Sequence, residues 1–204
     1  VGLFVVWERH RARNRRDAIL DPSLFSVRTF TWGNLTAAAV AAGEFALVFV
    51  LPLFLVNALG LGIMAAGWVL AAMAIGAFVS GAQARHLAAR LSPTKVVLLG
   101  LALEVAGVAA LALLLSSTMP AWAVAVPLVV YGVGLGLASA QLTSTVLAAV
   151  PPAPSAARSA TPSTARQVGS ALGTALVGST LAASLGYTVA TRLADIAGFP
   201  AALA

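Results

Sequence analysis

Two glutamates, Glu44 and Glu104, are the residues best suited to chemistry in this sequence, because each stands within a long run of apolar residues. An ionised side chain at the centre of a bilayer-spanning helix costs about 2.5–3.5 kcal/mol on insertion scales, so such residues are rare and usually functional. A carboxyl at that depth can bind a proton or a cationic substrate. The alternative is a permanently protonated carboxyl that forms a static hydrogen bond between helices. We expect Glu44 to be the more important of the two.

Small residues accompany both carboxyls at helical spacing. Glu104 lies between Gly100 and Gly107, four residues after one and three before the other, so the three share one helix face. Glu44 shares its helix face with Gly33, Ala37, Ala41 and Val48, at spacings of three and four. Small residues let a neighbouring helix approach closely, so these faces are expected to pack inside a bundle or to line a cavity. Gln141 is a third candidate for binding a proton or substrate, from a cavity wall.

Four further glycines form two pairs with a spacing of four: Gly132 with Gly136, and Gly169 with Gly173. The first pair, with Gly134 between, superficially resembles a nucleotide-binding fingerprint. That fingerprint needs a preceding strand and, in the phosphate-binding loop, a Lys followed by Ser or Thr, and the sequence has neither. Both pairs are therefore predicted to be helix packing faces.

Other kinds of chemistry have no residues to support them. The chain has no cysteine, which excludes thiolate metal ligands and cysteine nucleophiles. Its two histidines, His10 and His86, lie far apart in basic segments, so no metal site is expected. No Ser-His-Asp grouping can be assembled. We expect neither enzymatic activity nor a bound cofactor.

The elements that must position these residues follow from composition. The chain has 204 residues, of which 60% are hydrophobic and 9% charged, whereas soluble domains are about 25% charged. A bilayer-spanning helix needs about 20 mostly apolar residues. We therefore predict an all-α polytopic membrane protein. The first residues, Val1–Trp7, resemble the end of a preceding helix, and we expect the chain to be part of a longer protein. The five full transmembrane helices are predicted to cover approximately residues 31–57, 61–84, 96–116, 121–149 and 167–187.

Basic residues mark one side of the predicted bundle. They lie in a linker over residues 8–30, in the loop that contains Arg90 and Lys95, and before the fifth span, whereas Arg192 lies on the other side. Because Lys and Arg in short loops are retained in the cytoplasm, the basic loops are predicted to be cytoplasmic. The net charge of +6 is divided among these loops without interleaved aromatic residues, so nucleic acid is not an expected partner. The lipid bilayer is an expected partner, and the run Arg9–Arg16 could touch anionic headgroups.

Several stretches resemble one known family. Leu87–Lys95 is similar to a cytoplasmic loop motif, Gly-x-Leu-Ala-Asp-Arg-x-Gly-Arg-Lys, with Ala89 in place of Asp and Ser92 in place of Gly. Ala165–Ala175 resembles the start of a penultimate helix, Arg-Gln-x-Gly-x-x-x-Gly, and Asp21–Phe30 resembles the linker into a late helix. On these residues the chain resembles the major facilitator superfamily, and within it the fourteen-helix drug:proton antiporter branch.

The resemblance extends over about residues 1–186 and implies part of a C-terminal helix bundle, from the end of the eighth helix to just before the fourteenth. It implies a multi-pass protein of the plasma or inner cell membrane that exports a small amphipathic substrate, with the proton gradient as its energy source. The N-terminal helices of the same protein would be its partner. By the same resemblance, Arg90 and Lys95 belong to the cytoplasmic loop motif. The alternatives are a non-transporting assembly or sensor subunit, and a transporter of the same superfamily for a sugar or another metabolite.

Overall fold

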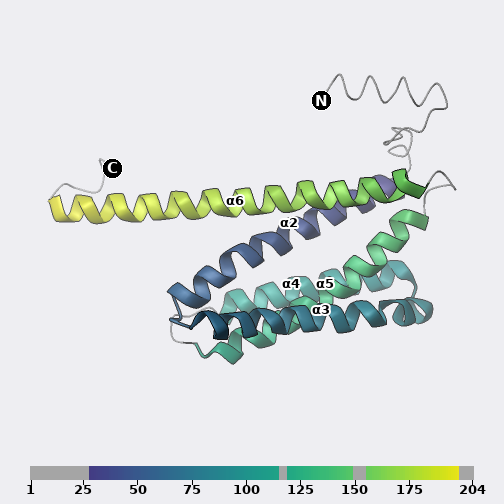
Figure 1. Cartoon of the computed structure of the whole chain (residues 1–204), viewed down its shortest axis with the longest axis horizontal. Helices are drawn as coiled ribbons and strands as arrows, with labels where there is room; N and C mark the ends of the chain where they lie inside the picture. The colour runs from purple at the N-terminus through teal and green to yellow at the C-terminus, as the bar shows by residue number, and fades with distance from the viewer. Residues whose placement is uncertain (1–27, 115–118, 149–154, 198–204) are drawn as a thin grey trace, which may run out of the picture.

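The computed structural model describes residues 28–114, 119–148 and 155–197, and these residues form five long helices without a strand. Each is long and apolar enough to cross a membrane, which confirms the predicted all-α fold with five spanning helices. Figure 1 shows them as a bundle in which α6 lies alongside α2. In chain order the helices are α2 Arg28–Asn57, α3 Ile63–Leu91, α4 Pro93–Leu114, α5 Ala121–Ala148 and α6 Ser155–Ala197.

The helices extend beyond several of the predicted apolar spans. Helix α2 already begins at Arg28, so the last three residues of the predicted basic linker, 28–30, are helical. Helix α3 continues to Leu91, and α6 begins at Ser155, twelve residues before the predicted start at 167. Alanine, leucine and arginine, which favour helix, extend α3 past its apolar core. The predicted helix end at residues 1–7 and the linker up to residue 27 lie outside the described residues.

Helix α5 is the centre of the bundle. It packs along α3 on one side and α4 on the other, and 56% of its most apolar window is buried, against 17% for α6. The close packing comes from glycine. Gly132 and Gly136 bring the α5 backbone against the carbonyls of Met73 and Ala77 on α3. A side chain at either position would collide with that backbone, so α3 and α5 are held at their minimum separation.

The opposite face of α5 meets α4 in the same way. A Cβ added at Gly100 would lie 2.7 Å from the Gly134 carbonyl, and one added at Gly107 would lie 2.7 Å from the Tyr131 nitrogen. Both glycines are buried, as is Glu104 between them. The face of α4 that carries Glu104 therefore points into the bundle.

Helices α2 and α6 form a second close pair. Gly169 and Gly173 of α6 lie directly against the carbonyl groups of Ala38 and Ala42 on α2. Beyond this contact α6 extends past the end of α2, with Tyr187 exposed (Figure 1).

The turn between α3 and α4 contains an unusual backbone conformation at Ser92, with φ 90° and ψ 147°. This combination lies close to a region that is essentially restricted to glycine. The Ser92 N–H donates to the Ala88 carbonyl at 2.9 Å and so ends α3, and α4 begins at the next residue, Pro93.

Candidate functional site

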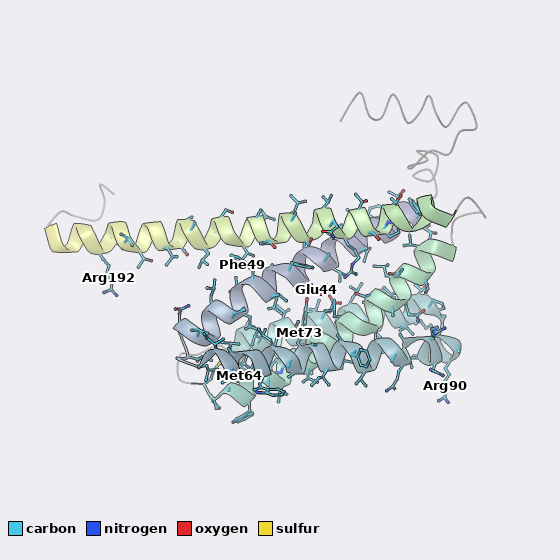
Figure 2. The ribbon with its side chains drawn as sticks, in the orientation of Figure 1. Glu44, Phe49, Met64, Met73, Arg90 and Arg192 are labelled. Atoms are coloured by element: carbon cyan, nitrogen blue, oxygen red, sulfur yellow. The ribbon has the colours of Figure 1, made fainter. Side chains whose placement is uncertain are left out.

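Glu44 lies midway along α2, about 24 Å from its first residue at 1.5 Å per residue. Figure 2 shows it in the part of the bundle where α2, α5 and α6 come together. Its Oε2 accepts a hydrogen bond from Nη2 of Arg166 on α6 at 3.3 Å, which makes the two an ion pair. The side chains are 21% and 33% exposed, respectively. The ion pair lies at membrane depth, where it is largely shielded, and both of its side chains remain partly accessible.

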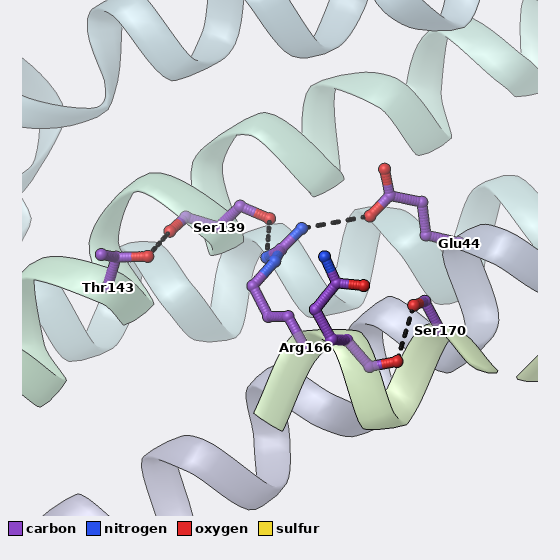
Figure 3. A network of polar contacts seen from close by, with 6 residues as sticks. Glu44, Ser139, Thr143, Arg166 and Ser170 are labelled. Carbon is purple, nitrogen blue, oxygen red and sulfur yellow. Dashed lines mark hydrogen bonds and ion pairs between the residues drawn. The ribbon is translucent and has the colours of Figure 1, made fainter. Parts of the chain in front are cut away.

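Arg166 also contacts a third helix. Its Nη1 donates to the Ser139 hydroxyl of α5 at 3.3 Å, and the Ser139 carbonyl accepts from the Thr143 hydroxyl at 3.0 Å. Figure 3 shows the Arg166 guanidinium between Glu44 and Ser139. Tight charge-assisted bonds measure about 2.7–2.9 Å, so both Arg166 contacts are loose. An arginine that makes one long bond to each of two partners can separate from its carboxylate more easily than an arginine held to the carboxylate by two short bonds.

Glu104 on α4 is buried, and among the described residues its Oε1 has no hydrogen-bond partner. Gly43, the residue before Glu44 on α2, lines a cavity that Glu104 also lines. The two glutamates thus come from different helices that meet at one cavity.

An apolar cavity of about 630 Å³ adjoins Glu104. Its volume lies in the range of about 300–1,000 Å³ that small-molecule sites occupy. Four helices contribute to its walls, and Glu104 and Tyr131 are its polar members among residues such as Val108 and Val177. A second cavity of about 420 Å³ reaches Glu104 past Trp32. The arrangement can accept an amphipathic molecule whose polar group meets the carboxyl.

The ion pair has a smaller cavity of its own. Glu44 and Arg166 both line a space of about 330 Å³, together with Gln167 and Ser170 of α6. The carboxylate is thus accessible from one side and bonded to Arg166 on the other. Such access is what a group needs in order to exchange a proton during function.

The remaining predicted site residues lie elsewhere. Gln141 is 3% exposed, and its side-chain oxygen accepts a hydrogen bond from the Ser144 hydroxyl at 3.3 Å, outside the walls of the cavities above. Its binding role stays a prediction. Arg90 and Lys95 are exposed at the α3–α4 turn and line none of these cavities. The cavities at Glu44 and Glu104 therefore have neither Gln141 nor Arg90 nor Lys95 in their walls.

Arg166 is the residue that sequence reasoning missed. With the fifth span predicted from residue 167, Arg166 is expected among the basic residues that precede the span. That expectation is wrong, because α6 begins at Ser155 and Arg166 is eleven residues into it. A signal was available. Arg166, Gly169 and Gly173 are spaced by three and four, so Arg166 shares the glycine face that packs on α2.

The chain is 34% identical over 181 residues to an uncharacterized MFS-type transporter, YvkA, of Bacillus subtilis, covering 86% of this chain and 39% of the relative. It is 32% identical over 180 residues to the riboflavin transporter RibZ of Clostridioides difficile, covering 83% and 37%. It is 30% identical over 169 residues to the multidrug efflux pump LfrA of Mycolicibacterium smegmatis, covering 82% and 33%. The chain thus spans between a third and two fifths of the length of these relatives.

The family comparison agrees with the fold. Residues 3–174 match the model of the Major Facilitator Superfamily, and the five helices give the match its expected multi-pass membrane form. The match extends from the N-terminal residues through Arg166 and the Gly169–Gly173 face of α6. The chain belongs to the Major Facilitator Superfamily.

Proposed function

We propose that this chain is part of a proton-coupled secondary transporter that exports small amphipathic compounds by alternating access. Members of the superfamily are transporters and not enzymes. The observation that carries the proposal is the loose Glu44–Arg166 ion pair, which stands at membrane depth next to the α2 segment that lines the Glu104 cavity. The relatives are more than twice as long as this chain, so a second helix bundle would complete the transport path.

In this mechanism a proton and a substrate favour different conformations. A proton on Glu44 removes the negative charge that Arg166 faces, while the Ser139 hydroxyl on α5 still accepts from Arg166. The polar contact between α2 and α6 is then weakened, and the equilibrium between the two conformations shifts. A substrate that meets Glu104 favours the opposite conformation, so its release accompanies protonation.

The energy available decides how many groups take part. A partly exposed ion pair contributes on the order of 1 kcal/mol, whereas inverting an equilibrium from 1:99 to 99:1 takes about 5.5 kcal/mol. Glu44 alone therefore does not drive the change. Glu104, the substrate and the second bundle supply the rest, which is why we assign binding to both carboxyls.

The first prediction tests Glu44 in the whole transporter, reconstituted into vesicles with an imposed pH gradient. Glu44→Gln keeps the shape of the side chain and removes its proton exchange, so the initial rate of substrate efflux should fall at least tenfold and lose its dependence on the gradient. Asp195→Asn is the matched control, because it removes a carboxyl about 43 Å further along α6 than Arg166. Efflux by Glu44→Gln that still follows the pH gradient would exclude Glu44 as the coupling carboxyl.

The substrate class is a separate part of the proposal. One relative is a riboflavin transporter and another a multidrug efflux pump. The walls of the 630 Å³ cavity are apolar apart from Glu104 and Tyr131, which favours a lipophilic compound with one polar or cationic group over a polyhydroxylated one. Efflux of lipophilic cations and of riboflavin, measured side by side, separates these substrates. A non-transporting sensor would move neither, and its Glu44–Arg166 pair would not respond to pH.

The proposed location is the cell membrane, with the basic loops on the cytoplasmic side. The support is the distribution of Lys and Arg, which are concentrated at one end of the bundle, as in Arg85, Arg90 and Lys95 at the α3–α4 turn.

A further inference from the structure

A groove of about 380 Å³ lies between α3 and α5, away from the carboxyl site. Its polar members, Ser80, Gln83, His86 and Arg90, come from successive turns of α3, and its apolar members include Val79 of α3 and Val133 of α5. It shares no wall residue with the cavities at Glu44 and Glu104. The mechanism above does not use it.

The groove changes from polar to apolar along the direction that would cross the bilayer. Arg90 is one residue from the end of α3, His86 about 7 Å from it and Val79 about 18 Å, at 1.5 Å per residue. The 29 residues of α3 span about 43 Å, close to the 40–45 Å of a bilayer with its headgroups. Arg90 and His86 therefore lie at headgroup depth, and Val79 lies at the depth of the acyl chains.

The apolar end of the groove continues along the outside of α3. Phe78, beside Val79, is 80% exposed, and Ile75, one turn further, is 60% exposed. A row of exposed apolar side chains that runs inward from a basic headgroup-level site matches the shape and polarity of a phospholipid. Figure 2 shows Arg90 projecting from the end of α3, away from the rest of the bundle.

We propose that this groove binds an anionic diacyl phospholipid. The phosphate lies against the Arg90 guanidinium and an N–H of His86, and one acyl chain lies along Val79 and Phe78. Basic pockets between transmembrane helices are suited to anionic headgroups, and the guanidinium fork matches phosphate oxygens geometrically. A cation at a helix end is also favoured by the helix dipole, but that effect explains neither the groove nor the apolar row below it. The proposal does not depend on transport.

The second prediction measures lipid retention by the whole transporter. The purified protein is delipidated in detergent, titrated with phosphatidylglycerol or with phosphatidylcholine of the same acyl chains, and analysed by native mass spectrometry. Arg90→Ala should weaken phosphatidylglycerol binding about fivefold, the contribution expected of one basic residue near a membrane surface. Arg90 is exposed, so its removal leaves the fold intact. Binding of phosphatidylcholine should be weaker and unchanged by the substitution.

Arg85→Ala is the matched control, because Arg85 is an exposed basic residue of the same helix that does not line the groove. It should leave phosphatidylglycerol binding within twofold of the unmodified protein. Equal losses in the two variants would overturn the proposal, since they would indicate general charge attraction. Glycerol 3-phosphate added in excess should not displace the lipid. Displacement would overturn the proposal in favour of a site for a soluble phosphate compound.

A second measurement asks whether the groove faces lipid at all. The chain has no cysteine, so Val79→Cys introduces a single thiol in this segment, and Val69→Cys, at a buried position of the same helix, serves as the reference. In a membrane, a nitroxide spin label attached to the cysteine at 79 should collide with dissolved oxygen much more often than a label attached at 69. Equal shielding of the two labels would show that another helix covers the groove, and no lipid could then occupy it.

Discussion

Arg166 contacts two helices because of the shape of its side chain. The guanidinium presents separate nitrogens in a rigid fork, and here Nη2 faces Glu44 while Nη1 faces Ser139. An ammonium group would act as a single point charge and would not fix both directions. Since Ser139 is neutral, it can keep its bond to Arg166 in either protonation state of Glu44. The serine therefore gives the arginine a defined position when the carboxylate is neutralised.

The third prediction concerns Ser92, at the turn between α3 and α4. Its backbone lies at φ 90° and ψ 147°, where a non-glycine residue costs about 1–3 kcal/mol. Ser92→Gly should therefore raise the free energy of unfolding by about 1 kcal/mol, because the greater freedom of glycine in the unfolded chain offsets part of the relief.

Thermal unfolding of the whole transporter in detergent, followed by tryptophan fluorescence, provides the measurement for Ser92→Gly. Thr94→Gly, two residues further and inside α4, is the control and should lower the melting temperature, because glycine is unfavourable in a helix. A fall in stability with Ser92→Gly would contradict the assignment of strain to this turn.

Sequence reasoning identified the features at Glu44 and at Ser92 only in part. Glu44 and Glu104 were evident because an acidic residue in an apolar run is costly, and Ser92 was noticed because it replaces a glycine of the resembled motif. Neither the strain at Ser92 nor the Glu44–Arg166 pair could be obtained from residue types alone. The first depends on a backbone torsion, and the second on the register between α2 and α6, which are separated by more than a hundred residues.

At the scale of helices, glycine decides which contacts are rigid. The α5 contacts with α3 and α4 are continuous and buried, whereas α6 packs mainly on α2, through Gly169 and Gly173 and the Arg166 pair. Helices α3, α4 and α5 therefore form one firm block. The α2–α6 contact is the one that combines close backbone packing with a breakable polar interaction.

The fourth prediction tests that contact. A Cβ at Gly173 would meet the Ala42 backbone, so Gly173→Ala should lower the free energy of unfolding by about 1–3 kcal/mol, the typical cost of overpacking. Gly186→Ala is the control in the same helix. It has open space around it and should be neutral or stabilising, because alanine favours helix over glycine. Melting temperatures of the two variants, measured together, check the difference. Equal melting temperatures would rule out a close α2–α6 contact at Gly173.

The existence and type of the helices could be predicted, but some of their ends could not. Runs such as residues 31–57 are too long and too apolar for the surface of a soluble domain. Within lipid they must be helical, because a helix satisfies the hydrogen bonds of its own backbone. Hydropathy, however, reports the apolar core alone. It does not detect helix formed by the polar residues of Ser155–Arg166, where Pro162 also suggested a loop. This error at one helix end is what concealed the partner of Glu44.

At the scale of the whole molecule, the 630 Å³ cavity exists because four helices converge without filling the space between them. Valine and alanine dominate its walls, and their small side chains leave the volume open. No single helix pattern predicts this space, since it depends on how α2, α4, α5 and α6 are arranged in three dimensions.

The fifth prediction fills this cavity. Val108→Trp places a large ring in its wall and should weaken transport of bulky substrates about fivefold or more, because crowding of this kind costs about 1–3 kcal/mol. Initial efflux rates for a large and a small substrate, compared in vesicles, give the readout. Val126→Trp on α5, an exposed position outside the cavity walls, is the control. Equal effects of the two substitutions would exclude the cavity as the substrate path.

The position of Arg166 also bears on how the protein is made. Helix α6 is the least apolar of the five spans, and an arginine within a span adds to the cost of inserting it. Helix α2, with Glu44, emerges from the ribosome more than a hundred residues earlier. Its carboxylate can therefore already be in the bilayer when α6 leaves the translocon, and it can receive the arginine there. We therefore expect α6 to integrate more efficiently after a helix that carries its ion-pair partner, Glu44.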